Sequence, residues 1–104
     1  MNFFANLTDA SQEEQFEELL QKDGVRIERI TSMGQVSPEG FWYEQEENEW
    51  LMLLEGEARL QLESGEEISL KRGDTYFLPA LKKHRVSYTS TEPICLWLAI
   101  FWKN

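Results

Sequence analysis

The sequence predicts an all-β protein: a single antiparallel β-barrel of the jelly-roll type with a short N-terminal helix before it. From residue 25 onward, short extended segments are separated by Gly, Pro, Asn and Asp turn signals, with no helical segment between them. An α/β fold would need helices between its strands. A chain of 104 residues, 41% of them hydrophobic, can bury one core but not two. We therefore expect one domain over residues 1–104, with an arm and helix in 1–24 and the barrel in 25–102.

The short helix is predicted between Ser11 and Gly24. Ser11 and Glu14 have the spacing of a capping box, in which each side chain bonds the other residue's backbone amide. Apolar residues at positions 16, 19 and 20 follow at helical spacing, and Gly24 supplies a left-handed stop. The apolar stripe is narrow, so this helix should pack on a larger body.

The strands begin at Val25, where the hydrophobic pattern changes to a period of about two residues. Residues 31–40 contain two glycines and a proline, which predict an irregular connection. Further extended segments are predicted at 41–46, 49–55, 57–63, 66–70, 75–78, 85–89 and 94–102. Short strands spaced in this way are typical of a sandwich or a small barrel.

A β-hairpin is predicted where a three-residue polar connection joins the segments that contain Gln45 and Glu49. A loop of this length sets Gln45 roughly opposite Glu49, where Cβ atoms lie about 5 Å apart. Tyr43 shares their face because residues two apart in a strand point the same way. Leu51 and Leu53 continue that face, so Glu49 should lie at the rim of an apolar interior and need a partner there.

His84 is the only histidine in the chain, and it lies where a loop is predicted to enter a strand. Its position alone favours an exposed loop residue. Lys82, Lys83 and Arg85 around it form the one basic cluster of an acidic protein. These charges either draw an anionic ligand toward the barrel mouth or stay solvated.

Two spacings connect these residues to a known pattern. Six residues separate Glu49 from Gly56. On the other side of Glu49, three residues separate it from Gln45, and Tyr43 lies two positions before Gln45. In the second stretch five residues separate Gly73 from Pro79, and Leu81, His84 and Tyr88 follow at the spacing of the same pattern. Both stretches resemble the paired motifs of the cupin superfamily.

In the first motif, Tyr43 and Gln45 stand at the two histidine positions and Glu49 matches the glutamate. In the second motif, His84 is in register, whereas a leucine replaces a glycine and Tyr88 replaces an asparagine. The chain is thus similar to a small single-domain cupin with a degenerate metal-binding motif. In many cupins the four motif positions bind a catalytic metal inside the barrel, and other cupins are metal-free binding or sensing modules.

The resemblance makes Tyr43, Gln45, Glu49 and His84 the candidate ligands of a divalent metal ion. No organic cofactor is indicated. Without a metal, Glu49 and His84 could pair directly, because each charge favours the other. Such a pair is a buried structural element, an anchor for a polar ligand, or an acid–base couple.

Strand parity extends this set to a candidate ligand-binding pocket. Leu53 should also face the interior, and a bulge after His84 would reverse the residues that follow it. The candidate pocket residues are Phe41, Tyr43, Gln45, Glu49, Leu51, His84, Val86 and Tyr88.

Three functions are compatible with these residues. The first is binding of a small polar molecule in the barrel interior, with or without a metal ion. The second is a metal-dependent cupin enzyme of the dioxygenase, isomerase or decarboxylase type. The third is a dimeric structural or interaction protein whose barrel interior is packed. Whether the protein is an enzyme is left open.

Composition excludes some partners. A net charge of −9 repels phosphate backbones and anionic membrane surfaces, so we expect neither a nucleic acid nor a membrane partner. The longest apolar run, 94–102, is nine residues and too short to span a bilayer. The single cysteine, Cys95, and the lack of a signal-peptide pattern at the N-terminus predict a cytoplasmic protein.

A homodimer is expected from apolar surface that one barrel cannot bury. Residues 94–102 are apolar on both faces. Trp50, Met52 and Leu54 lie opposite the face that carries Glu49, on the outside of the barrel. Either the N-terminal helix or a second subunit should cover them.

Overall fold

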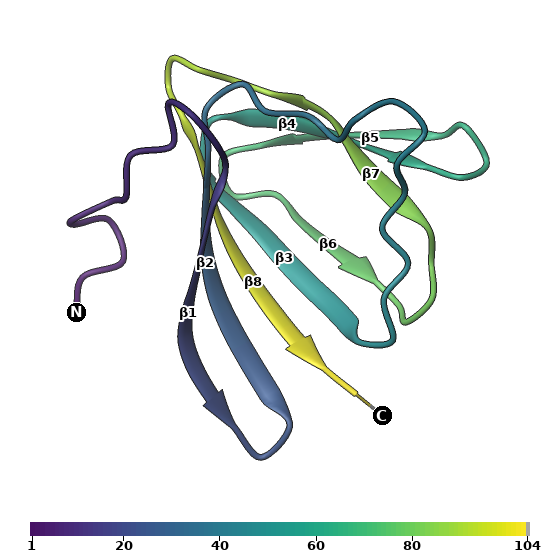
Figure 1. The fold of residues 1–104 in the computed structure, drawn as a ribbon, viewed down its shortest axis with the longest axis horizontal. Coiled ribbons are helices and arrows are strands. Elements are labelled where there is room, and N and C mark those ends of the chain that lie inside the picture. The colour runs from purple at the N-terminus through teal and green to yellow at the C-terminus, as the bar shows by residue number, and fades with distance from the viewer. Residues whose placement is uncertain (104) are drawn as a thin grey trace.

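The computed structural model describes residues 1–103, and all regular secondary structure in that range is β-strand. Antiparallel pairing joins the strands into two sheets, in the orders β1-β2-β8-β3-β6 and β5-β4-β7 (Figure 1). The strands are β1 (Gln15–Lys22), β2 (Val25–Ser32), β3 (Asn48–Glu55), β4 (Glu57–Leu62), β5 (Glu67–Lys71), β6 (Thr75–Leu78), β7 (His84–Thr89) and β8 (Cys95–Trp102). The all-β prediction is confirmed.

The predicted N-terminal helix is wrong: residues 15–22 form β1, which pairs with β2 along its length. Asp23 and Gly24 are the two central residues of the connecting hairpin, with φ of 52° and 81°. Positive φ at both positions is the type I′ turn, whose twist matches that of paired strands. The residue interpreted as a helix stop therefore belongs to a turn that continues a sheet.

The predicted strand at 41–46 is also wrong. Only Tyr43 makes a β-bridge there, and it pairs with His84 rather than with the segment around Glu49. Further along, the backbone amide of Leu81 donates to the Gln45 carbonyl oxygen at 2.7 Å. The segment is held against the start of β7 because its polar backbone groups find partners there.

The core lies between the two sheets. Leu53 and Trp97 face it from the larger sheet, and Leu60 and Leu62 face it from the smaller one, all buried. The chain crosses from one sheet to the other at Gly56, the single residue between β3 and β4. Packing on both sides of this corner fixes how the two sheets face each other.

The N-terminal arm covers the outer face of β2, where Arg29 points away from the barrel interior. The Arg29 guanidinium donates to the carbonyl oxygens of Phe3, Ala5 and Asn6 and to the Glu17 carboxylate. Five donors in a planar fork allow one buried arginine to hold both the arm and β1. Residues 1–103 include no helical segment capable of spanning a bilayer.

Candidate functional site

A pocket of about 90 Å³ opens between the two sheets. Most of the residues expected at the site line it, contributed by β3, β7 and the 41–46 segment: Tyr43, Gln45, Glu49, Leu51, His84 and Val86. Further lining residues lie on β2, β4, β8 and the chain just before and within β1: Glu14, Phe16, Glu28, Ile30, Leu60, Trp97 and Phe101. The pocket is therefore more acidic and more aromatic than the sequence motifs indicate.

Two expected residues do not line the pocket. Phe41 is 44% exposed and packs edge-on against the Tyr43 ring at a centroid distance of 4.9 Å. Tyr88 is 38% exposed on the outer face of β7, where the Arg59 guanidinium lies 4.9 Å from its ring centroid. A register shift between β4 and β7 inserts one extra residue before Tyr88 and reverses its direction, while Val86 stays inward.

Tyr43 and His84 lie side by side through their paired backbones. The Tyr43 amide donates to the His84 carbonyl oxygen at 2.7 Å, and the His84 amide returns a bond at 3.1 Å. Their rings stack with centroids 5.3 Å apart and planes 20° apart. The backbone bridge and the stacked rings hold the imidazole in one position at the pocket wall.

The His84 imidazole is buried, 5% exposed, and its protonation is directed by one contact. Nδ1 lies 3.0 Å from the Lys82 carbonyl oxygen, which only accepts, so in the neutral ring Nδ1 carries the proton. Burial lowers the pKa of His84 below its usual value. The other nitrogen, Nε2, thus presents a lone pair to the pocket.

Glu49 faces that lone pair from β3. The distance from Glu49 Oε1 to His84 Nε2 is 3.9 Å, too long for a direct hydrogen bond. Burial raises the pKa of Glu49 to about 7, although the hydrogen bond donated by Gln45 Nε2 to Oε1, at 3.1 Å, opposes the rise. At neutral pH the carboxyl is therefore close to the midpoint of its titration, beside a neutral imidazole.

A second carboxylate, Glu14, reaches the pocket from the chain before β1. The Ser32 hydroxyl donates to it, and the Trp97 indole N–H donates to the same hydroxyl at 3.1 Å. Burial raises the pKa of Glu14, and burial with the charges of Glu14 and Glu49 raises the pKa of the Tyr43 phenol. The phenol therefore keeps its proton at neutral pH.

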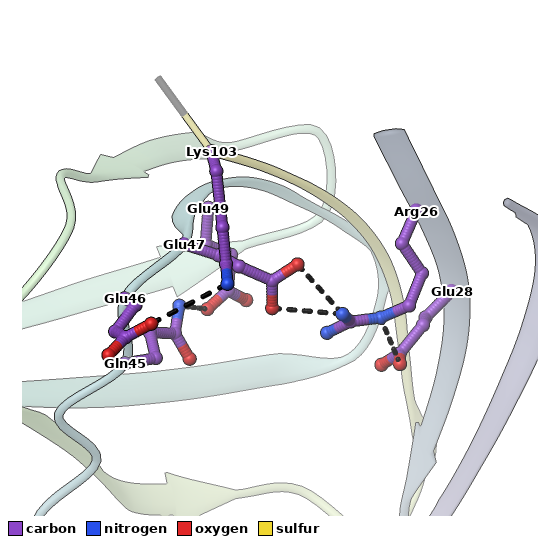
Figure 2. A network of polar contacts seen from close by, with 7 residues as sticks. All are labelled: Arg26, Glu28, Gln45, Glu46, Glu47, Glu49 and Lys103. Atoms are coloured by element: carbon purple, nitrogen blue, oxygen red, sulfur yellow. Dashed lines mark hydrogen bonds and ion pairs between the residues drawn. The ribbon is translucent and has the colours of Figure 1, made fainter. Parts of the chain in front are cut away.

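Arg26 lies close to the pocket, and its positive charge is paired with two carboxylates. Figure 2 shows its guanidinium between two carboxylates, with Nε 3.0 Å from Glu28 and Nη1 2.8 Å from Glu47. The same group lies over the Phe101 ring, 4.2 Å from the centroid. In the figure the Gln45–Glu49 pair is a separate contact, so Arg26 does not neutralise Glu49 by direct pairing.

The basic side chains next to His84 in the sequence do not point into the pocket. Lys83 pairs with Glu63 at 3.3 Å, and Arg85 donates to Gln61 and to the Ser37 carbonyl oxygen. Lys82 is exposed, and its carbonyl oxygen, not its ammonium, contacts His84. In residues 1–103, none of the three lines the pocket.

The donors present do not fit a divalent metal centre of the kind implied by the motifs. A non-haem iron site uses two imidazoles and one carboxylate. Within residues 1–103, no three His, Cys, Asp or Glu side chains gather closely enough to hold a metal. Gln45 turns its N–H toward Glu49, and Tyr43 retains its phenolic proton, so neither replaces the missing imidazole.

Comparison with known families gives one match. A family model described as "Cupin domain" matches residues 33–101. Among curated proteins no sequence match is found. The matched range includes the two motifs, the five strands β3 to β7 in full, and β8 up to its last residue but one.

Solved structures agree with this match. A protein from Ralstonia eutropha JMP134, named as a candidate mannose-6-phosphate isomerase, is 36% identical with a TM-score of 0.94, over 100% of this chain and 97% of that one. A cupin superfamily protein from Desulfitobacterium hafniense DCB-2 is 20% identical with a TM-score of 0.79, over 94% and 84%. KdgF from a Halomonas species is 20% identical with a TM-score of 0.73, over 93% and 86%. The last two show the fold alone.

Proposed function

The chain belongs to the cupin domain family, and from this premise we propose that its barrel interior binds a small polar molecule, without a metal, between Glu49 and His84. The observation that carries the proposal is the gap between two buried polar groups. Glu49 Oε1 and His84 Nε2 face each other at 3.9 Å inside a pocket, and no hydrogen bond to Nε2 is seen within residues 1–103. Both side chains line the pocket, so a ligand bound there can form hydrogen bonds with Glu49 and with Nε2 of His84.

The size of the pocket limits the ligand. A water molecule occupies about 30 Å³ in the liquid, so about 90 Å³ holds a molecule of a few heavy atoms or one end of a larger one. A pocket of this volume favours a binding protein over a barrel whose interior is fully packed. Because the Glu49 carboxyl titrates near neutral pH beside a neutral imidazole, the pair can also accept and return a proton of the ligand.

A sugar phosphate, which the name of the Ralstonia relative suggests for that protein, suits this pocket poorly. A phosphate group would face Glu14, Glu28 and Glu49, and no Lys or Arg of residues 1–103 lines the pocket to meet it. Phosphate sites are typically built from arginine, lysine or helix N-termini. We therefore do not extend that substrate to this chain.

Binding is tested by nuclear magnetic resonance on ¹⁵N-labelled protein. Small alcohols, amines, amides and carboxylates are titrated one at a time, and the Gln45 side-chain amide and the Trp97 indole N–H report on the pocket. We expect at least one class to shift both signals in a saturable way, and His84→Ala to weaken that binding about tenfold, the loss of one hydrogen bond to a buried partner. Shifts confined to surface groups, or none at all, would remove the proposal.

We also propose that two copies associate through the outer face of the larger sheet. Trp50 lies directly opposite Phe77 on β6 and Ile100 on β8, so the three share that face. Phe77 is 48% exposed and stacks on Trp102 with centroids 6.0 Å apart. The helix expected to cover this face is instead strand β1, which leaves a second copy as the covering surface.

Light scattering at micromolar concentration should therefore give the mass of a dimer for the native chain. Phe77→Glu places a charge in the proposed contact and is expected to give a monomer that keeps the native circular dichroism spectrum. Phe41→Glu, at another exposed aromatic ring, serves as the matched control and should stay dimeric. A native chain that is monomeric under these conditions contradicts the proposed association.

A further inference from the structure

The charge of the pocket points to the chemical class of its ligand. Three carboxylates line it, Glu14, Glu28 and Glu49, and they come from three different parts of the chain. Lysine and arginine are absent from its lining within residues 1–103. The Arg26 guanidinium, which lies over the lining residue Phe101, is paired with Glu28 and Glu47. The full chain carries a net charge of −9, so the long-range field also favours a cation.

The hydrogen-bonding groups of Glu49 and His84 also favour a cationic ligand. His84 Nε2 offers a lone pair, because the proton of the neutral ring is on Nδ1, which donates a hydrogen bond to the Lys82 carbonyl oxygen. An ionised Glu49 offers only acceptors, and one of its oxygens already receives the Gln45 N–H. A ligand that binds between the ionised Glu49 and His84 must therefore donate hydrogens to both. A protonated amine has up to three N–H donors and a positive charge.

The remaining wall suits the organic part of such a ligand. Leu51, Leu60 and Val86 provide aliphatic surface, and Tyr43 and Trp97 provide aromatic rings. Aromatic rings attract cations through their negative faces, by about 0.5–2 kcal/mol in proteins. One lining residue, Phe101, already makes such a contact with a residue outside the lining, since the Arg26 guanidinium lies 4.2 Å from its ring centroid.

We infer that the pocket binds a small protonated amine, with its ammonium group between Glu49 and His84 and its alkyl part against the apolar wall. The inference rests on the proposed function, because it names the ligand class of the same site. Glu49 supplies the countercharge, Nε2 of His84 accepts a second N–H, and the small volume selects amines of a few heavy atoms.

Three probes of similar size and different charge test the inference: n-propylammonium chloride, n-propanol and sodium propionate. Each is titrated at pH 8, where Glu49 is largely ionised, with the Gln45 and Trp97 signals as reporters. We expect propylammonium to bind at least tenfold more tightly than propanol, and propionate to cause no saturable shift. Glu49→Gln should reduce the affinity for propylammonium about ten- to a hundredfold, the range for losing a charge-assisted hydrogen bond. Glu66→Gln, an exposed carboxylate away from the pocket, should leave it unchanged.

The outcomes separate this inference from the proposed function. If propanol or propionate binds in the pocket as tightly as propylammonium, the amine inference falls and the proposed function stands. An equal loss of affinity in Glu49→Gln and Glu66→Gln would show that only surface charge attracts the probe, which also overturns the inference. If no member of the wider panel shifts the pocket signals, the proposed function falls with it.

Discussion

Gly56→Ala is expected to destabilise the protein by about 3–5 kcal/mol, a large part of the 5–15 kcal/mol typical of a domain. A Cβ at this position would lie 2.5 Å from the Ile94 carbonyl oxygen, 2.8 Å from Ser90 Oγ and 2.9 Å from Cys95 Cα. Two of these atoms belong to the backbone, and the serine hydroxyl is fixed by its bonds to the backbone of the same corner. Residue 56 also has φ of +91°, which costs a non-glycine residue about 1–2 kcal/mol in addition to the overlap.

Gly73→Ala is the matched control. Gly73 has the same φ of +91°, but a Cβ there meets nothing within 4 Å. Its replacement should cost only the conformational part, about 1–2 kcal/mol. Urea unfolding of both variants measures the difference, which isolates the steric contribution of the corner between β3 and β4. Equal free energies of unfolding for the two variants would contradict the close packing around Gly56.

Much of the fold could be predicted from the sequence because its turns, including the one at Gly56, are marked by local residues. Gly56 and Gly73 lie at turns that the spacing of apolar segments already indicates, and strands β3 to β8 follow that spacing. Such turns depend on residues next to each other in the chain. The prediction was correct where the structure is determined by local turn chemistry and alternation.

The N-terminal helix shows where local patterns fail. Ser11, Glu14 and the apolar residues after them satisfy the rules for a helix start, yet pairing with β2 determines the structure. The Asp23-Gly24 pair was the available signal, because Asp-Gly between two extended runs favours a two-residue hairpin. Glycine is also the commonest residue just after a helix, so Gly24 is compatible with a helix end as well as with a hairpin.

The site was predicted in part for a similar reason. Gln45 does contact Glu49, but through a segment that docks on β7 and not through the expected hairpin. Glu14 and Glu28 were missed because they lie on or beside β1 and β2, which pairing over long sequence distances brings to the pocket. Strand alternation predicts that Tyr88 faces inward, because the extra residue in β7 cannot be recognised from the hydrophobic pattern.

Glu49→Gln is expected to stabilise the protein at pH 8 by up to about 3 kcal/mol. Burial raises the pKa of Glu49 in the folded protein to about 7, against 4.5 for the free side chain. Its contribution to stability is therefore fully present below about pH 4.5 and is lost as the pH rises through about 7. At about 1.4 kcal/mol for each tenfold change in a protonation equilibrium, that loss is about 3 kcal/mol. A neutral glutamine of the same shape avoids the loss and can still accept the hydrogen bond from Gln45.

The measurement is the free energy of urea unfolding between pH 5 and pH 8, and the quantity of interest is the difference between the native chain and Glu49→Gln. That difference should grow in favour of the variant as the pH rises, whereas Glu66→Gln, whose carboxylate is exposed, should follow the native chain. A native chain that loses stability on addition of a chelator, with Glu49→Gln less stable at pH 8, would show instead that Glu49 holds a metal.

His84→Ala and the double variant complete the cycle. Burial lowers the pKa of His84, so its contribution to stability is present above about pH 6.5 and is lost as the pH falls through the lowered value. Because Glu49 and His84 face each other at 3.9 Å in one pocket, the charge state of each changes the cost of burying the other. We therefore expect a coupling free energy of about 1 kcal/mol between the two substitutions near pH 7, within the range for residues that share one network. Additive effects at every pH would mean that the two groups titrate independently, and the acid–base pair proposed at the centre of the pocket would then be wrong.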